Sequence, residues 1–352
     1  MSDAMTLFSQ ALEQLRLAAV NVPGLTELAQ FPFLFRPLVM VVLLGVVAGV
    51  IGVIVNLRSA EFSAEAMVHA VFPGIVAGAV YWGIDAIIPA ASVVAVAAAV
   101  VLTIVSHRSR RGEASEAGTA VVLTSFFSIG LILSLAKGDM SGQLEALMFG
   151  RLLEVTDARL AQALIVCAVA LLLIAATWKE QVAYAFDRTG ARASGLRILA
   201  LDLVLNTAIA AAVVSASTAV GILLVIGYLV IPGATARVLA SRVRTMVVVA
   251  IAVGVGGGYL GMLLMVLPET LDKPISPQAT VALVMTGILL LAVGVSTARE
   301  RLDRIRHRDH SAQPVTVAAA STTAGAEATT DRAGGAEGSA SGVTPVAERS
   351  RV

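Results

Sequence analysis

Long apolar runs decide the fold of this chain, and the first of them reads FLFRPLVMVVLLGVVAGVIGVIVN from Phe33 to Asn56. Arg36 is its only charged residue. A helix needs about 20 consecutive, predominantly apolar residues to cross the hydrocarbon core of a bilayer. A run of this length and composition therefore predicts a transmembrane helix.

Further runs of the same character follow along the chain. They cover Ala66–Gly83, Ala86–Ser106, Ala117–Ala136, Leu160–Trp178, Ile198–Ser215, Thr218–Ala234, Met246–Leu267 and Ala279–Thr297. Each is expected to be a helix, because a segment in lipid must satisfy its own backbone hydrogen bonds and no alternating barrel pattern is present. The second run is short and contains Pro73-Gly74. The prediction is an all-α, polytopic membrane bundle of about nine (eight to nine) transmembrane helices.

The composition of the whole chain agrees with a membrane protein. Of the 352 residues, 57% are hydrophobic and 14% are charged, whereas an average globular chain is about 25% charged. A net charge of +1 gives no basic surface for nucleic acid, so a nucleic-acid partner is excluded. Cys167 is the single cysteine, which excludes a disulfide framework and a thiolate metal cluster.

The chain divides into three parts by composition. The first part has leucines spaced among polar residues (Leu7, Leu12, Leu15 and Leu17), which predicts an amphipathic helix at the membrane interface. The last part is rich in Ala, Ser, Thr and Gly and has too few large apolar residues to fold, which predicts a disordered tail. The expected parts are an amphipathic segment (1–32), a transmembrane domain (33–302) and a disordered cytoplasmic tail (303–352).

Lysine and arginine mark the cytoplasmic side of a membrane protein when they gather in short loops. Such clusters follow the third, fifth, seventh and ninth runs, and they include Arg108, Arg188, Arg242 and Arg299. The alternate loops are nearly free of them. We therefore expect a cytoplasmic C-terminus.

Glu65 and His69 are the most informative ionisable residues within the apolar runs. Four residues apart on a helix, they share one face, and Glu61 lies on that face one turn earlier. A carboxylate and an imidazole can share a divalent cation: imidazole suits Zn, Fe and Ni, and carboxylate suits Mn. Spacing alone leaves a second interpretation open, in which a buried Glu–His hydrogen bond joins two helices.

Two polar segments remain beside the runs. The loop Phe186–Leu196 is either solvated or contains a short helix that docks on a soluble partner. Asp202, near the start of the sixth run, could pair with Arg197. The segment Leu144–Phe149 is expected to form a short surface helix. Since no phosphate-binding loop of the Walker type is present, energy for transport would come from a partner or an ion gradient.

Several of these segments together resemble the membrane permease subunits of ATP-binding-cassette importers for zinc, manganese and related metals. The motifs that carry the resemblance appear in the family's order: Leu57-Arg58 continuing to Glu65-Ala66-Met67-Val68-His69-Ala70-Val71-Phe72-Pro73-Gly74; Glu116-Ala117-Gly118-Thr119-Ala120; Leu147-Met148-Phe149-Gly150; Phe186-Asp187 through Gly195; and Gly221-Ile222-Leu223-Leu224-Val225 through Ile231-Pro232-Gly233-Ala234-Thr235-Ala236-Arg237. The resemblance extends from about residue 36 to 302. One departure is Glu65, where the family has an aspartate.

The resemblance implies a fold similar to the cobalamin and siderophore importer permeases, and a role in the cell membrane of a prokaryote. Glu65 and His69 would lie on a transient metal path, with Glu61 as a weaker participant. The ATPase subunit would contact Phe186, Asp187, Arg192, Ala193 and Gly195, and a binding protein outside the membrane would dock near Leu147, Phe149 and Gly150.

The resemblance also implies partners and cargo. The permease would form a homodimer in membrane lipid, joined to an ATP-binding-cassette ATPase and to the extracytoplasmic metal-binding protein. It would not itself be an enzyme and would bind no permanent cofactor, because ATP stays on the partner while Zn²⁺ or Mn²⁺, or iron, is the transported ion. Alternatives are a permease for a chelated metal such as a siderophore, against which an aromatic content of 5% argues, and a secondary carrier that uses Glu65 and Asp202 as proton or sodium relays.

Overall fold

The computed structural model describes residues 2–108, 112–136, 148–266 and 276–311, and in these ranges it contains helices and no strand. Eight of the helices are long and apolar enough to cross a membrane. They cover Pro32–Leu57, Glu61–Trp82, Ile87–Arg108, Glu116–Leu135, Asp157–Ala176, Ile198–Ser217, Val243–Val266 and Pro277–Arg301. A shorter apolar helix, Leu224–Leu239, lies in the region of the predicted seventh crossing. The all-α membrane bundle with eight to nine crossings is thus confirmed.

The helices are numbered in the order of the chain. Their bounds are α1 (Ser2–Val20), α2 (Thr26–Ala29), α3 (Pro32–Leu57), α4 (Glu61–Ala70), α5 (Phe72–Ala77), η1 (Gly78–Trp82), η2 (Ile84–Ala86), α6 (Ile87–Arg108), α7 (Gly112–Leu135), η3 (Leu152–Glu154), α9 (Asp157–Ala176), α10 (Trp178–Phe186), α11 (Arg188–Ala193), α12 (Ile198–Ser217), α13 (Ile222–Leu239), α14 (Val243–Val266) and α15 (Pro277–Ser311).

The second crossing is broken into three pieces, α4, α5 and the π-helical turn η1. Pro73 lies in the first turn of α5, where the missing N–H of proline removes no helical hydrogen bond. The helical segment begins at Glu61, five residues before the predicted run. As a result, Glu61, Glu65 and His69 are all part of one regular helix, α4.

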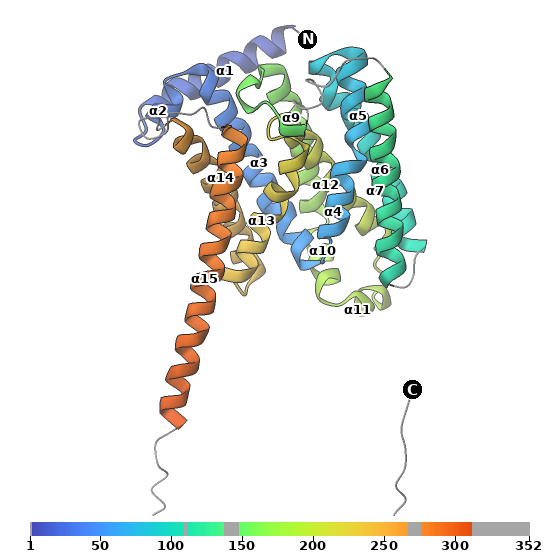
Figure 1. The fold of residues 1–352 in the computed structure, drawn as a ribbon, viewed down its shortest axis with the longest axis vertical. Coiled ribbons are helices and arrows are strands. Elements are labelled where there is room, and N and C mark those ends of the chain that lie inside the picture. Colours follow the sequence, from blue (N-terminus) through green and yellow to red (C-terminus); the bar gives the residue numbers. More distant parts are fainter. Residues whose placement is uncertain (1, 109–111, 137–147, 267–275, 312–352) are drawn as a thin grey trace, which may run out of the picture. The chain divides into compact units, whose positions relative to one another are not determined.

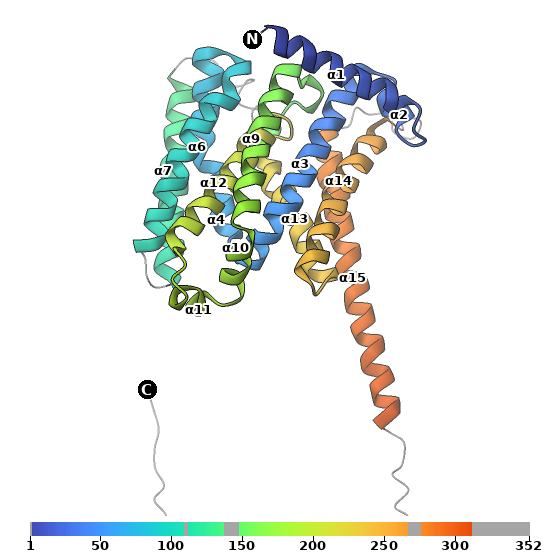
Figure 2. The ribbon, with the colours of Figure 1, turned by 180° about the vertical axis from the view of Figure 1, so that it is seen from behind.

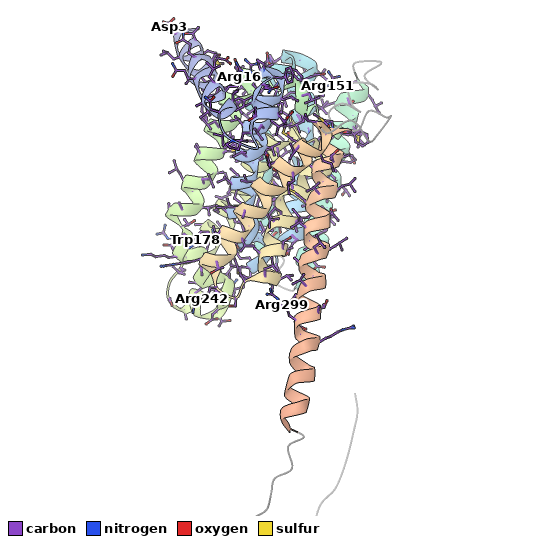
Figure 3. The ribbon with its side chains drawn as sticks, turned by 90° about the vertical axis from the view of Figure 1, so that its left-hand side faces the viewer. Asp3, Arg16, Arg151, Trp178, Arg242 and Arg299 are labelled. Atoms are coloured by element: carbon purple, nitrogen blue, oxygen red, sulfur yellow. The ribbon has the colours of Figure 1, made fainter. Side chains whose placement is uncertain are left out.

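The long helices run between two ends of the bundle (Figures 1 and 2). The helices α1 and α2 lie across one end, which we call the α1 end, and α11 lies at the other, the α11 end. In Figure 3, Arg16 and Arg151 lie at the α1 end, whereas Trp178, Arg242 and Arg299 lie toward the opposite end. Arginines from loops that the sequence placed on one side of the membrane are therefore gathered at one end of the bundle.

The helix α3 occupies the centre of the bundle, since 72% of its most apolar window is buried, compared with 22% for the windows of α7 and α15. Close packing on α3 depends on small residues. A Cβ atom added at Gly254 of α14 would lie 2.6 Å from the carbonyl oxygen of Gly45. A Cβ atom added at Gly233 of α13 would lie 2.6 Å from Nδ2 of Asn56. Such contacts allow helix backbones to approach closely within a membrane.

Residues Ser2–Val20 form the helix α1, in which Leu12 is buried and Leu7, Leu15 and Leu17 are exposed. A shared carboxylate holds α1 against the bundle. Oδ1 of Asp157 accepts a hydrogen bond from Nε of Arg36 (2.5 Å), and Oδ2 accepts one from Oγ of Ser9 (2.9 Å). The contact joins α1, α3 and α9 at the α1 end.

At the C-terminal side, α15 continues past the expected boundary at residue 302 and ends at Ser311. The first compact unit of the chain closes at Asp303. The rest of the predicted tail, 312–352, lies outside the described residues, so its disorder stays a prediction.

Candidate functional site

A tight turn joins α3 to α4 and brings the candidate metal residues into the bundle. The turn consists of Arg58, Ser59 and Ala60. Ser59 has a φ of 51°, in the left-handed region that few residues other than glycine adopt. This conformation reverses the chain within three residues, and Glu61 begins α4 directly afterwards.

The three predicted metal-path residues share the one face of α4 that the bundle leaves open. Glu65 is exposed, and Glu61 and His69 are half-buried, whereas the intervening Ala64, Ala66, Met67 and Val68 are buried. Within the described part of the chain, neither glutamate takes part in a hydrogen bond or an ion pair. Both carboxylates are therefore available to a ligand or to another subunit.

The imidazole of His69 is held in place by packing. Its ring lies 5.3 Å, centroid to centroid, from the ring of Phe127 on α7. Its Nδ1 atom is buried and has no hydrogen-bond partner among the described residues. The alternative interpretation required a buried Glu–His hydrogen bond, and no such bond joins His69 to Glu65. An unpartnered buried nitrogen next to an exposed carboxylate fits a ligand position better than a structural link.

One protomer alone does not complete a metal site. Among the residues that the structure describes, no group of three or more His, Cys, Asp or Glu side chains could hold a metal ion. A structural zinc site is usually completed by four protein ligands. A cation on the α4 face would therefore need its remaining ligands from water or from groups elsewhere.

Of the two interpretations of the loop Phe186–Leu196, the structure has the short helix, which is α11. Asp187 caps its N-terminus: Oδ1 accepts hydrogen bonds from the backbone N of Thr189 (3.0 Å) and of Gly190 (2.8 Å). Gly195, with a φ of 80°, ends the segment in the left-handed conformation. On the inner side, Ala191 packs with Tyr184 of α10.

The outer side of this segment is open. Phe186 is 71% exposed, and Arg192 and Ala193 are also exposed. Of the predicted ATPase-contacting residues, Asp187 and Gly195 therefore shape the segment, while Phe186, Arg192 and Ala193 are exposed. The helix α11 itself lies at the α11 end (Figure 1).

A cluster of polar side chains that sequence reasoning missed lies between the two sites. Asp202 forms an ion pair with Nη2 of Arg58, and its Oδ2 lies 3.4 Å from Nδ1 of His107. The expected pair of Asp202 with Arg197 is wrong. These two residues are five positions apart, which turns their side chains about 140° away from each other on a helix.

Arg58 makes further contacts in this cluster. Its Nη1 donates a hydrogen bond to Oε1 of Gln181 (2.6 Å), and its guanidinium lies 4.2 Å above the ring centroid of Tyr184. Burial raises the pKa of the Tyr184 hydroxyl above its ordinary value, and the nearby Asp202 carboxylate adds to the shift. A cavity of about 350 Å³ adjoins the cluster. Arg58 is part of the motif that runs from Leu57 to Gly74, but nothing in the sequence indicates its partners.

The predicted docking residues near the α1 end differ in exposure. Phe149 is 52% exposed. Gly150 is buried: its carbonyl accepts a hydrogen bond from Nε2 of Gln278 (2.7 Å), and it packs on the backbone of Gly221. Leu147 lies outside the described residues, as does most of the expected surface helix Leu144–Phe149.

With this geometry established, the chain can be compared with known proteins. The model of the ABC 3 transport family matches residues 30–296. The manganese transport system membrane protein MntC of Listeria monocytogenes is 34% identical over 239 residues, which are 68% of this chain and 83% of that protein. The chelated iron transport system membrane protein YfeC of Yersinia pestis is 30% identical over 65% of this chain and 77% of its own length.

Two solved structures are similar in fold. PsaBC from Streptococcus pneumoniae, in complex with Fab, superimposes with a TM-score of 0.65 and 26% identity and covers 76% of this chain and 94% of the matched chain. An inward-facing conformation of a putative metal-chelate type ABC transporter superimposes with a TM-score of 0.60 over 83% of this chain and 99% of the other, at 11% identity. The second likeness concerns the fold alone.

Proposed function

The chain belongs to the ABC 3 transport family, and from that membership we propose that it is the permease subunit of an ATP-driven importer that carries divalent transition-metal ions across a bacterial membrane. The observation that carries the proposal is the open face of α4. Among the described residues, the carboxylates of Glu61 and Glu65 and the Nδ1 atom of His69 have no hydrogen-bond partner. Relatives named for manganese and for chelated iron transport support the class of cargo.

Manganese is the cargo that we favour. Manganese accepts carboxylate oxygen readily and also binds imidazole, whereas zinc and iron bind imidazole at least as well. The two glutamates outnumber the histidine on the α4 face, and the relative from Listeria monocytogenes is named for manganese. Zinc and iron are the competing ions that the experiment below must separate.

We propose that the α11 end faces the cytoplasm, and with it the C-terminus. Arg188 and Arg192 are on or next to α11, Arg242 follows α13, and Arg299 lies toward the end of α15 that Figure 3 shows away from α1. Basic residues in short loops favour the cytoplasmic side. In this orientation the exposed Phe186, Arg192 and Ala193 are available to an ATPase subunit, which would bind and hydrolyse the ATP.

A second copy of the chain would complete the path. On the face of α4 that carries the candidate ligands, Glu65 is exposed and Glu61 and His69 are half-buried in the single chain; exposed Phe62 lies beside it. An exposed carboxylate face is costly in lipid, so it is expected to face a water-filled path or a symmetry-related subunit. Two copies facing each other across a two-fold axis would offer two sets of ligands to one ion.

The proposed transport cycle depends on weak binding of the metal ion by the permease. A binding protein outside the membrane, docked near Phe149, would deliver the ion to the path between the two α4 helices. The ion would be held by Glu65 and His69 of each copy, with water filling the remaining positions. Because the ion must also leave, a loosely held site suits transport better than a closed one. ATP binding at the α11 end would switch the opening from one side of the membrane to the other.

A chelated metal is the second candidate cargo. It is favoured by the relative named for chelated iron transport from Yersinia pestis. A chelate presents its own ligands to the protein, so its transport would not depend on direct coordination by His69. Dependence on His69 therefore distinguishes the two candidates.

The experiment compares uptake of manganese, zinc and iron in cells that express the full-length chain with its ATPase and binding protein. His69→Ala and Glu65→Gln should each lower manganese uptake by about 10-fold or more, since even indirect partners of a metal typically contribute 10–100-fold. Glu300→Gln, at an exposed position of α15, is the matched control and should leave uptake unchanged. Normal uptake by His69→Ala at equal protein levels would refute direct coordination, and uptake of zinc or iron in place of manganese would reassign the cargo.

A further inference from the structure

The helix α4 packs directly on α12, and Arg58 adds polar contacts from the α3–α4 turn to α10 and α12. Among the described residues, Arg58 makes every hydrogen bond and ion pair between the turn (57–60) and the helices α10, α11 and α12. Its side chain is only 9% exposed. The turn lies immediately before α4, so any movement of Arg58 acts directly on the helix that carries Glu61, Glu65 and His69.

Arg58 binds both α10 and α12 with a planar group. It donates to Gln181 on α10 (2.6 Å), pairs with Asp202 on α12, and stacks at 4.2 Å on the ring of Tyr184. Three contacts of different geometry require the flat, forked guanidinium, which the ammonium of lysine cannot imitate. If Arg58 moved alone, the Asp202 carboxylate would lose its arginine and keep only its contact with Nδ1 of His107 (3.4 Å), and breaking a buried ion pair is destabilising. The cluster is therefore expected to move together.

Tyr184 continues the contact to α11. The guanidinium of Arg188, the first residue of α11, lies 5.4 Å from the centroid of the same ring. Ala191 of α11 packs on Tyr184 in one apolar cluster with Ile198 and Leu201. The ring of Tyr184 is thus contacted by α11 and by Arg58.

A cavity leaves room for this cluster to shift. It has a volume of about 350 Å³ and is lined on one side by Ser59, Ala60 and Ser63 and on the other by Tyr184, Arg188 and Asp202. Figure 2 shows α10 and α11 at the same end of the bundle, next to α4 and α12. The cavity therefore leaves unfilled space between the α3–α4 turn and the residues of α10, α11 and α12 that line it.

We propose that Arg58 is a positioning residue that transmits displacement of α11, through Tyr184, to the start of α4, and so sets which side of the membrane Glu65 and His69 face. The inference rests on the proposed function, since it assigns the internal connection between the ATPase-facing segment and the metal path. The role proposed for Arg58 is to transmit a movement within the permease. Arg58 is not a metal ligand, because its guanidinium is positively charged and would repel a cation.

The test uses the full-length chain assembled with its ATPase subunit in proteoliposomes, with metal-loaded binding protein outside. ATP hydrolysis, manganese uptake and the amount of assembled complex are measured together. Arg58→Ala and Tyr184→Ala should each lower uptake by about 10-fold or more while hydrolysis and assembly stay within about twofold, in the range of ordinary coupling between sites. Tyr184→Phe retains the stacked ring and should transport at the wild-type rate.

Two further variants separate coupling from folding. Arg58→Lys keeps a positive charge beside Asp202 but loses the stacking, and it should assemble normally and transport poorly. Arg242→Ala removes an exposed arginine at the same end of the bundle, outside the cluster, and should behave as wild type. If Arg58→Ala does not assemble with the ATPase subunit, the result is decided by Arg58→Lys and Tyr184→Ala.

Uptake within twofold of wild type in Tyr184→Ala and Arg58→Lys would overturn the inference and leave the proposed function intact. A parallel loss of assembly, hydrolysis and uptake in those same two variants would also overturn it, because it would indicate a structural role alone. A wild-type complex that hydrolyses ATP but takes up no manganese would instead contradict the proposed function.

Discussion

The contact between α3 and α14 permits a quantitative prediction, because α14 offers a matched control within the same turn. Gly254→Ala would place a Cβ atom 2.6 Å from the carbonyl oxygen and 3.0 Å from the Cα of Gly45. Gly256→Ala would place one with no neighbouring atom within 4 Å. Both variants add the same methyl group to the same helix, two positions apart.

The expected difference follows from two opposing effects. Replacing a helical glycine by alanine favours the helix by about 1 kcal/mol at either position. At Gly254 the neighbouring atoms belong to backbone, so α3 and α14 must separate, and overpacking of this kind typically costs about 1–3 kcal/mol. We therefore expect Gly254→Ala to be less stable than Gly256→Ala by about 1–3 kcal/mol, and Gly256→Ala to equal or exceed wild type.

The measurement is reversible unfolding of the purified protein in mixed micelles, titrated with a denaturing detergent and followed by the far-ultraviolet signal of the helices. Both variants are compared with wild type under the same lipid-to-detergent ratio. Gly254→Ala unfolding at the same or a higher detergent fraction than Gly256→Ala would refute the close approach of α3 and α14.

Two further predictions use the same preparation. Gly221 has a φ of 86° and packs on the backbone of Phe149 and Gly150, whereas Gly195 has a φ of 80° and open space around it. Alanine at Gly195 should lower the free energy of unfolding by about 1–2 kcal/mol, from the left-handed backbone alone. Alanine at Gly221 should lower it by about 1–3 kcal/mol more, because the added Cβ also meets the packed backbone. Equal losses in the unfolding titration would contradict this packing. Asp157→Asn weakens the contact that joins Arg36 and Ser9, so limited proteolysis should cleave the segment containing α1 faster than in wild type, because local opening depends on the few contacts that hold the segment. Glu154→Gln, in an exposed ion pair with Arg151, is the control, and unchanged cleavage of Asp157→Asn would show that α1 is held by other contacts.

The placement of the helices could be predicted from the sequence because it depends on a local property. Apolar runs of about 20 residues have few stable conformations in a bilayer other than a helix. For the loop Phe186–Leu196 the sequence left a solvated loop and a short helix open, although Asp187 at its start is an N-cap and Gly195 at its end is a helix-ending glycine. Both kinds of signal are read from neighbours along the chain.

The break in the second crossing was only partly visible. Pro73 indicated an interruption, but the start of the helix at Glu61 was missed because Glu61 and Glu65 lower the hydropathy of that stretch. Ionisable residues that serve a function lower the hydropathy of a helix, so the helix is harder to predict from its apolar residues.

The sequence by itself determined that this chain spans a membrane many times, that its arginines gather on one side, and that Glu65 and His69 share a helical face. Only the tertiary structure decided that the face is open, that Nδ1 of His69 has no partner among the described residues, and that Asp202 pairs with Arg58, 144 positions away. Helix formation in lipid depends on residues within one or two turns, whereas the partner of a charge depends on which helices pack together, and many arrangements of the same helices are compatible with one pattern of hydropathy.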